Sequence, residues 1–177
     1  MKPNIVLCGF MGCGKTTVGQ HLSLALHLPF YDSDEVIEQQ AGKTISQIFA
    51  EDGEAAFRTM ERQVIAQLTQ HQGVIIATGG GVVLDPQNVA ALKETGTIYH
   101  LDPSVEKLME NLENDHTRPL LEVPNREQRI RQLHRERESR YTSVRDYAIC
   151  EDLLPNVVEH ILELYQKQKT DNNQQTT

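Results

Sequence analysis

The chain has 177 residues, of which 38% are hydrophobic and 24% charged, so it is long enough for one ordinary domain with a hydrophobic core. Its 25 acidic and 17 basic residues give a net charge of −8, which argues against a surface built for sequence-independent binding to nucleic acid or an anionic membrane. The sequence has no apolar run long enough to span a bilayer, and its 3 cysteines lack metal-ligand spacing, which favours a reducing, cytoplasmic compartment.

Apolar runs and helical stripes alternate along the chain. The expected strands are 4–8, 29–32, 73–78, 97–101 and 147–150. The expected helices are 18–28, 34–42, 44–52, 53–70, 85–96, 102–111, 125–141 and one begun by Pro155. This alternation predicts an α/β protein with a parallel sheet covered on both faces.

Local signals mark several helix starts and two irregular segments. Thr44 and Gln47 form a predicted capping box, and an Asp-Pro pair opens the helices at both 85–86 and 102–103. The segment 113–125 is polar and twice interrupted by proline, so we expect a loop. The polar segment 166–177 is expected to be a disordered tail.

The stretch GFMGCGKTT between the first strand and the first helix contains the pattern GxxxxGKT as Gly9, Gly14, Lys15 and Thr16. Such a loop presents backbone N–H groups and a helix N-terminus to phosphates. Lys15 is placed to reach the β and γ phosphates, and the Thr16 hydroxyl to ligate Mg²⁺. Thr17 either adds a hydroxyl to the phosphate shell or is simply a residue of the first helical turn.

A phosphate loop alone does not distinguish an ATPase, a GTPase switch and a kinase. The guanine-selecting NKxD sequence is absent, and no aspartate closes the apolar run 73–78. Asp32 ends the second strand, where its carboxylate could serve magnesium. Asp34 either orients or deprotonates an acceptor hydroxyl, or it is the N-cap of the following helix.

Two helices carry arginines near their apolar stripes. Arg137 lies at helical spacing with Leu133 and Tyr141, but Arg140 shares that side, so periodicity does not choose between them. Arg58 follows Phe57 on an earlier helix. Guanidinium groups suit a carboxylate, which points to a small acid as acceptor. Internal ion pairs with the nearby glutamates are the alternative.

The segment 113–125 also contains Arg118, followed by a proline. An arginine on a mobile loop suits a lid that covers a transferring phosphoryl group and excludes water. A solvated arginine in a polar loop is the alternative interpretation.

The combined pattern resembles the shikimate kinases as far as about Tyr165. The matching motifs are GFMGCGKTT, YDSDEVIE, the FR of GEAAFRTME, TGGGVV, the RPLL of HTRPLLE and the RxxxY from Arg137 to Tyr141. The resemblance implies an α/β three-layer P-loop fold with a five-stranded parallel sheet flanked by helices. It also implies one kinase domain over 1–165, with a substrate-binding helical segment at about 33–62 and a lid at about 113–124.

The resemblance further implies transfer of the ATP γ-phosphoryl group to the 3-hydroxyl of shikimate, in chorismate and aromatic amino acid biosynthesis. We therefore expect ATP and shikimate as small-molecule partners, Mg²⁺ as cofactor, no nucleic acid or membrane partner, and a monomer. The implied catalytic residues are Lys15, Asp34 and Arg118. The implied ATP contacts are Gly12, Cys13, Gly14, Lys15, Thr16, Thr17 and Arg118. The implied metal ligands are Thr16 and Asp32. The implied shikimate contacts are Asp34, Arg58, Gly80 and Arg137, because the RxxxY match selects Arg137 over Arg140.

Two positions depart from the family pattern. Cys13 stands where Ala, Ser or Pro is common, and the stretch 151–155 offers neither the Arg nor the Gln that some members place against adenine. A related small-molecule kinase, such as one acting on gluconate, is one competing interpretation. A non-catalytic nucleotide-binding module is another, with the helix RIRQLHRERESR gripping RNA, although its glutamates and the net charge of the chain count against it.

Overall fold

The apolar runs form the strands of a central sheet. The computed structural model describes residues 4–115, 119–121 and 123–175, and in this part of the chain five parallel strands pair in the order β2-β3-β1-β4-β5. The strands are β1 (Asn4–Gly9), β2 (Phe30–Asp32), β3 (Ile75–Ala77), β4 (Gly96–Leu101) and β5 (Tyr147–Ile149). The predicted α/β class and parallel sheet are therefore confirmed.

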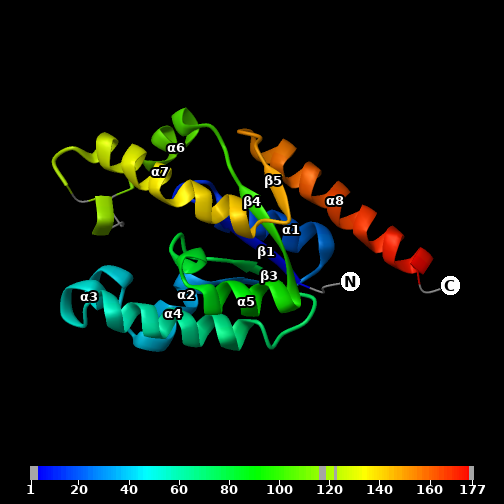
Figure 1. Cartoon of the computed structure of the whole chain (residues 1–177), viewed down its shortest axis with the longest axis horizontal. Helices are drawn as coiled ribbons and strands as arrows, with labels where there is room; N and C mark the ends of the chain where they lie inside the picture. Colours follow the sequence, from blue (N-terminus) through cyan, green and yellow to red (C-terminus); the bar gives the residue numbers. More distant parts are fainter. Residues whose placement is uncertain (1–3, 116–118, 122, 176–177) are drawn as a thin grey trace.

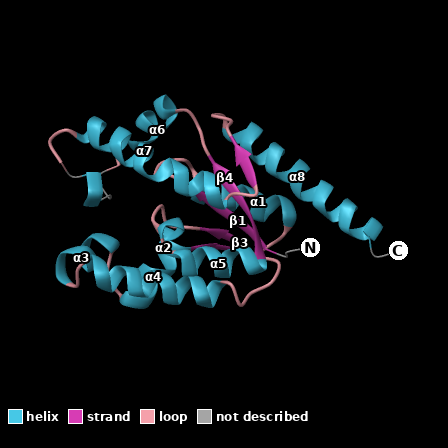
Figure 2. Ribbon diagram, viewed as in Figure 1, coloured by secondary structure: helices cyan, strands magenta, loops and turns pink. Residues whose placement is uncertain are grey.

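Helices cover both faces of the sheet (Figures 1 and 2). The helices are α1 (Lys15–Leu26), α2 (Ser33–Ala41), α3 (Ile45–Glu51), α4 (Glu54–Leu68), α5 (Pro86–Thr95), α6 (Val105–Leu112), α7 (Arg126–Val144) and α8 (Leu154–Gln175), with 3₁₀ turns η1 (Val82–Leu84) and η2 (Pro119–Leu121). α1 and α8 pack together on one face, while α5 and α7 pack against β4 on the other. None of the helices in the described ranges combines the length and apolarity needed to cross a membrane.

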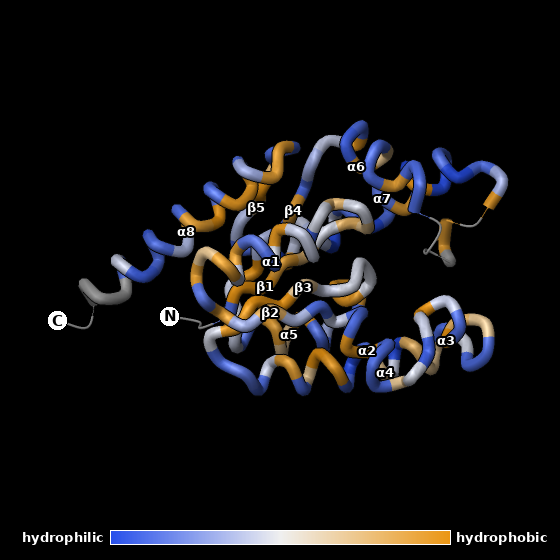
Figure 3. Tube along the Cα trace, turned by 180° about the vertical axis from the view of Figure 1, so that it is seen from behind, coloured by the Kyte–Doolittle hydropathy of each residue, from blue (hydrophilic) through white to orange (hydrophobic). Residues whose placement is uncertain are grey.

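The core lies in the middle strands. Every residue of β1 and β3 is buried, as expected for parallel strands that helices cover on both faces, and Figure 3 shows these strands as the most hydrophobic part of the trace. Because the strands are parallel, their carboxyl ends meet at one edge of the sheet. The loops after β1, β2 and β3 therefore converge there, which is where open α/β sheets bind ligands.

The predicted helix starts are mostly confirmed. Thr44 and Gln47 form the capping box of α3, and Asp85 caps α5 with a proline at the first position. Asp102 was wrongly predicted to begin the next helix. The N-cap of α6 is Ser104, whose hydroxyl accepts from the Lys107 amide at 3.2 Å. Asp102 is instead held in the sheet region, where its amide donates to the Ile149 carbonyl at 2.8 Å.

The C-terminal segment also differs from its prediction. α8 continues as a helix to Gln175, so residues 166–175 are helical where a disordered tail was expected. Buried Ile161 and Tyr165 anchor the middle of this helix, and the Lys169 ammonium lies 4.8 Å from the centre of the Tyr165 ring. Glutamine and lysine have good helix propensity, so a polar extension of an anchored helix can remain helical.

Candidate active site

The loop after β1 has the backbone geometry that its glycines predict. Gly12 and Gly14 have φ of 80° and 88°, a left-handed conformation that other residues rarely adopt. A Cβ on Gly12 would also lie 2.7 Å from the Leu112 Cγ. α1 begins at Lys15, immediately after this loop, so the loop and the positive end of the helix together form an anion-binding cradle.

Lys15 is folded back on this loop. Its Nζ donates to the carbonyls of Gly9 and Phe10 at 2.9 and 3.0 Å and lies 3.5 Å from the Cys13 Sγ. The ammonium therefore sits at the centre of the cradle. To reach a phosphate it exchanges neutral carbonyl acceptors for charged oxygens, which accept stronger hydrogen bonds.

Thr16, in the first turn of α1, lies beside Asp32 at the end of β2. The Thr16 hydroxyl donates to the Asp32 Oδ2 at 2.6 Å, while the Asp32 Oδ1 accepts from the Asp34 amide at 3.0 Å. Asp32 is thus the N-cap of α2, and the alternative in which Asp34 caps this helix is wrong. The Asp34 carboxylate lines both cavities described below.

The glycine triplet after β3 passes close to two charged side chains. A Cβ on Gly79 would lie 2.4 Å from the Asp34 Oδ1, and one on Gly81 would lie 2.3 Å from the Arg58 Nη1. The Gly79 amide donates to the buried Ser33 hydroxyl at 2.9 Å, which ties the triplet to the start of α2. Glycine at these positions allows the carboxylate and the guanidinium to approach the backbone.

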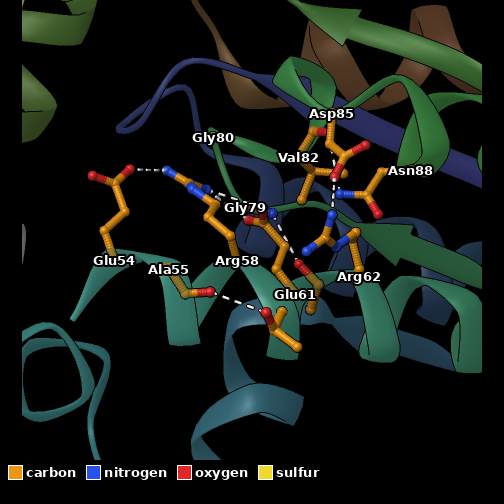
Figure 4. A network of polar contacts seen from close by, with 12 residues as sticks. Glu54, Ala55, Arg58, Glu61, Arg62, Gly79, Gly80, Val82, Asp85 and Asn88 are labelled. Atoms are coloured by element: carbon orange, nitrogen blue, oxygen red, sulfur yellow. Dashed lines mark hydrogen bonds and ion pairs between the residues drawn. The ribbon is translucent and has the colours of Figure 1, made fainter. Parts of the chain in front are cut away.

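Arg58 is anchored by acidic neighbours on its own helix (Figure 4). Its Nη1 donates to both carboxylate oxygens of Glu61 at 2.9 and 3.1 Å, and its Nη2 to Glu54 at 3.2 Å. The Glu61 side chain is only 2% exposed, and burial raises its pKa, although the Arg58 charge opposes that shift. The alternative of internal ion pairs is therefore realised for Arg58, but its guanidinium also borders a cavity.

α7 turns Arg137 inward and Arg140 outward. Arg137 is 7% exposed, whereas Arg140 is exposed, so the structure makes the choice that periodicity left open. The Arg137 Nη1 donates to the Gly80 carbonyl at 3.3 Å. Among the described residues no carboxylate pairs with it, so the ion-pair alternative is not realised for Arg137 in this part of the chain.

Two adjoining cavities open at this edge of the sheet. The first has a volume of about 620 Å³ and is lined by Asp34, Arg58, Glu61, Arg137 and the glycine triplet, among others. The second, of about 530 Å³, is lined by residues 11–18 and by Lys107, Asn111 and the stretch 151–154. The residues common to both linings are Met11, Thr16, Asp32, Asp34 and Gly80. A site with this division can bind a polyphosphate and a small acid next to each other.

The structure brings together every predicted site residue that it describes. Gly12, Cys13, Gly14, Lys15 and Thr17 line the second cavity, Arg58 and Arg137 the first, and Thr16, Asp32, Asp34 and Gly80 both. Arg118 lies outside the described residues, as do positions 116, 117 and 122 of the predicted lid.

Four residues of the site were not assigned a role from the sequence. Glu61 lies one helical turn after Arg58, and Tyr141 lies one turn after Arg137. Residues at this spacing are neighbours on a helix surface, so both contacts could have been inferred from the sequence. Ser33 and Asn111 gave no such signal, because they act across the fold. The Asn111 side chain donates to the Gly12 carbonyl at 2.8 Å from α6.

Comparison with known proteins agrees with this site. The family model described as "Shikimate kinase" matches residues 11–166. The shikimate kinase of Paracidovorax citrulli (strain AAC00-1) is 44% identical over 163 residues, with 89% of each chain covered. That of Legionella pneumophila (strain Corby) is 46% identical over 151 residues, covering 85% of this chain and 86% of the relative.

Solved structures give the same result. The shikimate kinase from Acinetobacter baumannii in complex with shikimate is 40% identical, with a TM-score of 0.90 and 94% of each chain covered. A gluconokinase from Sinorhizobium meliloti 1021 has a TM-score of 0.66 at 16% identity, covering 99% of this chain and 98% of the other, which is likeness of fold alone. The family model spans most of the chain, including residues 11–17 of the phosphate loop, the glycine triplet and Arg137, and two relatives are more than 40% identical, so the chain belongs to the shikimate kinase family.

Proposed function

We propose that this chain transfers the γ-phosphoryl group of ATP to the 3-hydroxyl of shikimate, giving shikimate 3-phosphate and ADP. The observation that carries the proposal is the pair of adjoining cavities, one lined by the phosphate loop and the other by Arg58 and Arg137. Asp34 borders both cavities, so it lies where a donor phosphate and an acceptor hydroxyl would meet. Membership of the shikimate kinase family supports this acceptor over other small acids.

Arg58 and Arg137 hold the shikimate carboxylate. They enter the first cavity from α4 and α7, on either side of the glycine triplet. Two guanidinium groups suit the planar carboxylate, since each can donate two parallel hydrogen bonds. The backbone of Gly80 borders the same acceptor. Together these groups fix the position of the reacting hydroxyl, which is a large part of catalysis in phosphoryl transfer.

Asp34 faces the acceptor hydroxyl, which it orients and whose proton it accepts. The Asp32 side chain fixes the start of α2 by accepting from the Asp34 amide, and Gly79 leaves room for the Asp34 carboxylate beside the backbone. The carboxylate is thereby held at the boundary of the two cavities. A base held within reach of the hydroxyl is more effective than one free to rotate.

The phosphate loop and α1 bind the ATP phosphates. The amides of Gly12 to Thr17 surround the anion, and Lys15 moves from the Gly9 and Phe10 carbonyls to the phosphate oxygens as charge develops. The Thr17 hydroxyl borders the same cavity and adds a donor.

Mg²⁺ fits the oxygen atoms at the cavity boundary. The Thr16 hydroxyl and the Asp32 carboxylate are hard oxygen donors that already lie 2.6 Å apart. Mg²⁺ is usually bound by one or two protein oxygens together with substrate phosphates and water. The ion would neutralise charge on the phosphates, and the chain contributes the two ligands that hold it in position.

Several features implied by the resemblance stay predictions. These are the kinase domain over 1–165, its substrate-binding segment at about 33–62, its lid at about 113–124, the lid role of Arg118, and the monomeric state. The cytoplasm is the proposed compartment, supported by Cys8, Cys13 and Cys150, which are all free thiols. Gluconate as acceptor is not favoured, because the likeness to the gluconokinase is confined to the fold.

The test is ADP release from Mg·ATP, coupled to pyruvate kinase and lactate dehydrogenase. We expect a large rate with shikimate and a low rate with gluconate or with no added acid. Equal rates with and without shikimate, from folded protein that binds ATP, would contradict the proposed acceptor. They would also return the non-catalytic nucleotide-binding module to consideration.

A further inference from the structure

The carbonyl of Gly80 receives two hydrogen bonds from α7. The Tyr141 hydroxyl donates to it at 2.6 Å and the Arg137 Nη1 at 3.3 Å. The two donors are four residues apart, so they lie on the same side of the helix, one turn from each other. The first cavity, lined by Arg58 and Arg137, is called the acid-binding cavity below. The Gly80 carbonyl in its wall is therefore shared by a neutral donor, the Tyr141 hydroxyl, and a charged donor, the Arg137 guanidinium.

Tyr141 is the more firmly held of the two. Its side chain is 2% exposed, and its ring stacks on His100 of β4 with centroids 4.9 Å apart and planes 15° from parallel. Burial raises the pKa of the Tyr141 phenol, so the hydroxyl remains protonated and donates at any ordinary pH. The bond from Arg137 is longer, and its guanidinium borders the cavity.

A bound carboxylate gives Arg137 a stronger acceptor than a neutral carbonyl. When the guanidinium turns toward that carboxylate, the Gly80 carbonyl loses one of its two donors. A carbonyl left without any donor in a closed site would oppose substrate binding, because the bond it made before is not replaced. The 2.6 Å bond from Tyr141 prevents this, since it does not depend on Arg137.

We propose that Tyr141 is a positioning residue for the acid substrate, holding the Gly80 carbonyl in place so that Arg137 is released to bind the carboxylate. The inference rests on the proposed function. Because the peptide group is planar, fixing this carbonyl also fixes the direction of the Gly81 amide. The Gly81 Cα lies against Arg58, so Tyr141 stabilises the backbone between the two arginines.

The first test is Tyr141→Phe, which removes only the hydroxyl and keeps the ring on His100. We expect the KM for shikimate to rise about 3- to 10-fold, the range given by one net hydrogen bond. The kcat and the KM for ATP should change less than about 2-fold. The matched control is Tyr99→Phe, because Tyr99 is fully buried in β4 and stacks on Tyr147 with centroids 5.4 Å apart. Tyr99→Phe removes a buried hydroxyl that does not line the acid-binding cavity, so it should keep the wild-type KM for shikimate.

The second test repeats Tyr141→Phe in an Arg137→Ala background. In this background no guanidinium has to leave the Gly80 carbonyl. We therefore expect the KM for shikimate of the double variant to be less than about 2-fold higher than that of Arg137→Ala alone. A merely structural role would multiply the KM by the same factor in both backgrounds, and that result would overturn the inference. So would an unchanged KM in the single variant. Absence of shikimate-dependent ADP release from the wild type would instead contradict the proposed function itself.

Discussion

At the scale of single residues, α7 carries one buried arginine beside an exposed one. Arg137 and Arg140 lie on the same helix, but only Arg137 is buried and borders the acid-binding cavity. We predict that Arg137→Ala raises the KM for shikimate about 10- to 100-fold, the range for losing hydrogen bonds to a charged group. The KM for ATP should remain nearly unchanged, because Arg137 does not line the nucleotide cavity.

Arg140→Ala is the matched control for this prediction, since it removes the same charge from the exposed side of the helix. Steady-state kinetics with each substrate varied in turn would measure both variants. If both raise the KM for shikimate equally, a long-range charge effect and not a contact would be responsible. An equal loss for ATP and shikimate in Arg137→Ala would indicate a folding defect.

The sequence indicated the phosphate loop, Asp32 and Asp34 as candidates through local signals, whereas Arg137 and Gly80 were selected only by the family resemblance. The sequence was not sufficient for their partners. Nothing local indicates that Lys15 lies on the Gly9 and Phe10 carbonyls, or that the Ser33 hydroxyl accepts from the Gly79 amide. The Ser33 contact depends on the pairing of β2 with β3, and the Lys15 contacts depend on how the loop after β1 folds back, neither of which a single sequence states.

At the scale of elements, the turn after β3 places the two charged groups of the acid site. Asp34 and Arg58 each approach a glycine Cα so closely that a methyl group there would displace the side chain. We predict that two equivalent substitutions change different kinetic constants. Gly79→Ala displaces the Asp34 carboxylate and lowers kcat at least about 10-fold, a typical loss for a displaced general base. Gly81→Ala displaces the Arg58 guanidinium and raises the KM for shikimate about 10-fold.

The two variants serve as each other's control, because the chain length, helix content and added methyl group are the same. Both should fold, since the clashing atoms are the ends of side chains and not backbone atoms. Melting temperatures would verify this, and kinetics at saturating ATP would separate kcat from KM. The same loss of kcat in both variants would show that the turn acts as one rigid unit and that neither glycine serves a particular side chain.

Element boundaries show which sequence signals are decisive. The Thr44 capping box and the Asp85 cap were predicted correctly, since each is completed within four residues. The Asp102 cap was wrong because a distant residue intervenes. The Asp152 carboxylate, on the loop after β5, accepts from both the amide and the hydroxyl of Ser104 at 2.7 and 2.8 Å. That bridge places the start of α6 two residues later than the Asp-Pro signal indicates.

At the scale of the whole molecule, periodicity predicted a parallel sheet but not its strand order. The order β2-β3-β1-β4-β5 places β1 in the middle, with the chain continuing to opposite sides of it. The phosphate loop therefore opens at the switch point of the sheet. The five strands expected from the apolar runs are the five that pair in the described part of the chain.

The sheet also makes stability depend on pH through His100, a residue of β4 between β1 and β5. It is 2% exposed, and burial lowers its pKa from 6.5 to about 4, although nearby Asp102 opposes the shift. The unfolded chain therefore binds a proton between pH 6.5 and 4 that the folded chain does not. The contribution of His100 to the free energy of unfolding is therefore fully present above pH 6.5 and is lost as the pH falls toward 4. Between pH 7 and 5 we predict a loss of about 2 kcal/mol in the free energy of unfolding.

Urea unfolding at pH 7 and pH 5 measures this loss, compared between the wild type and His100→Phe, which keeps an aromatic ring against Tyr141. The variant has no imidazole to protonate, so its loss between the two pH values should be smaller by about 2 kcal/mol. His21→Phe is the control, because His21 is exposed on α1 and should keep the wild-type pH dependence. If His100→Phe loses as much stability as the wild type, the acid sensitivity arises from other groups. His100 lies in β4, which pairs with β1 on one side and β5 on the other, so we expect its proton uptake to lower the free energy of global unfolding, which urea unfolding of the whole chain measures.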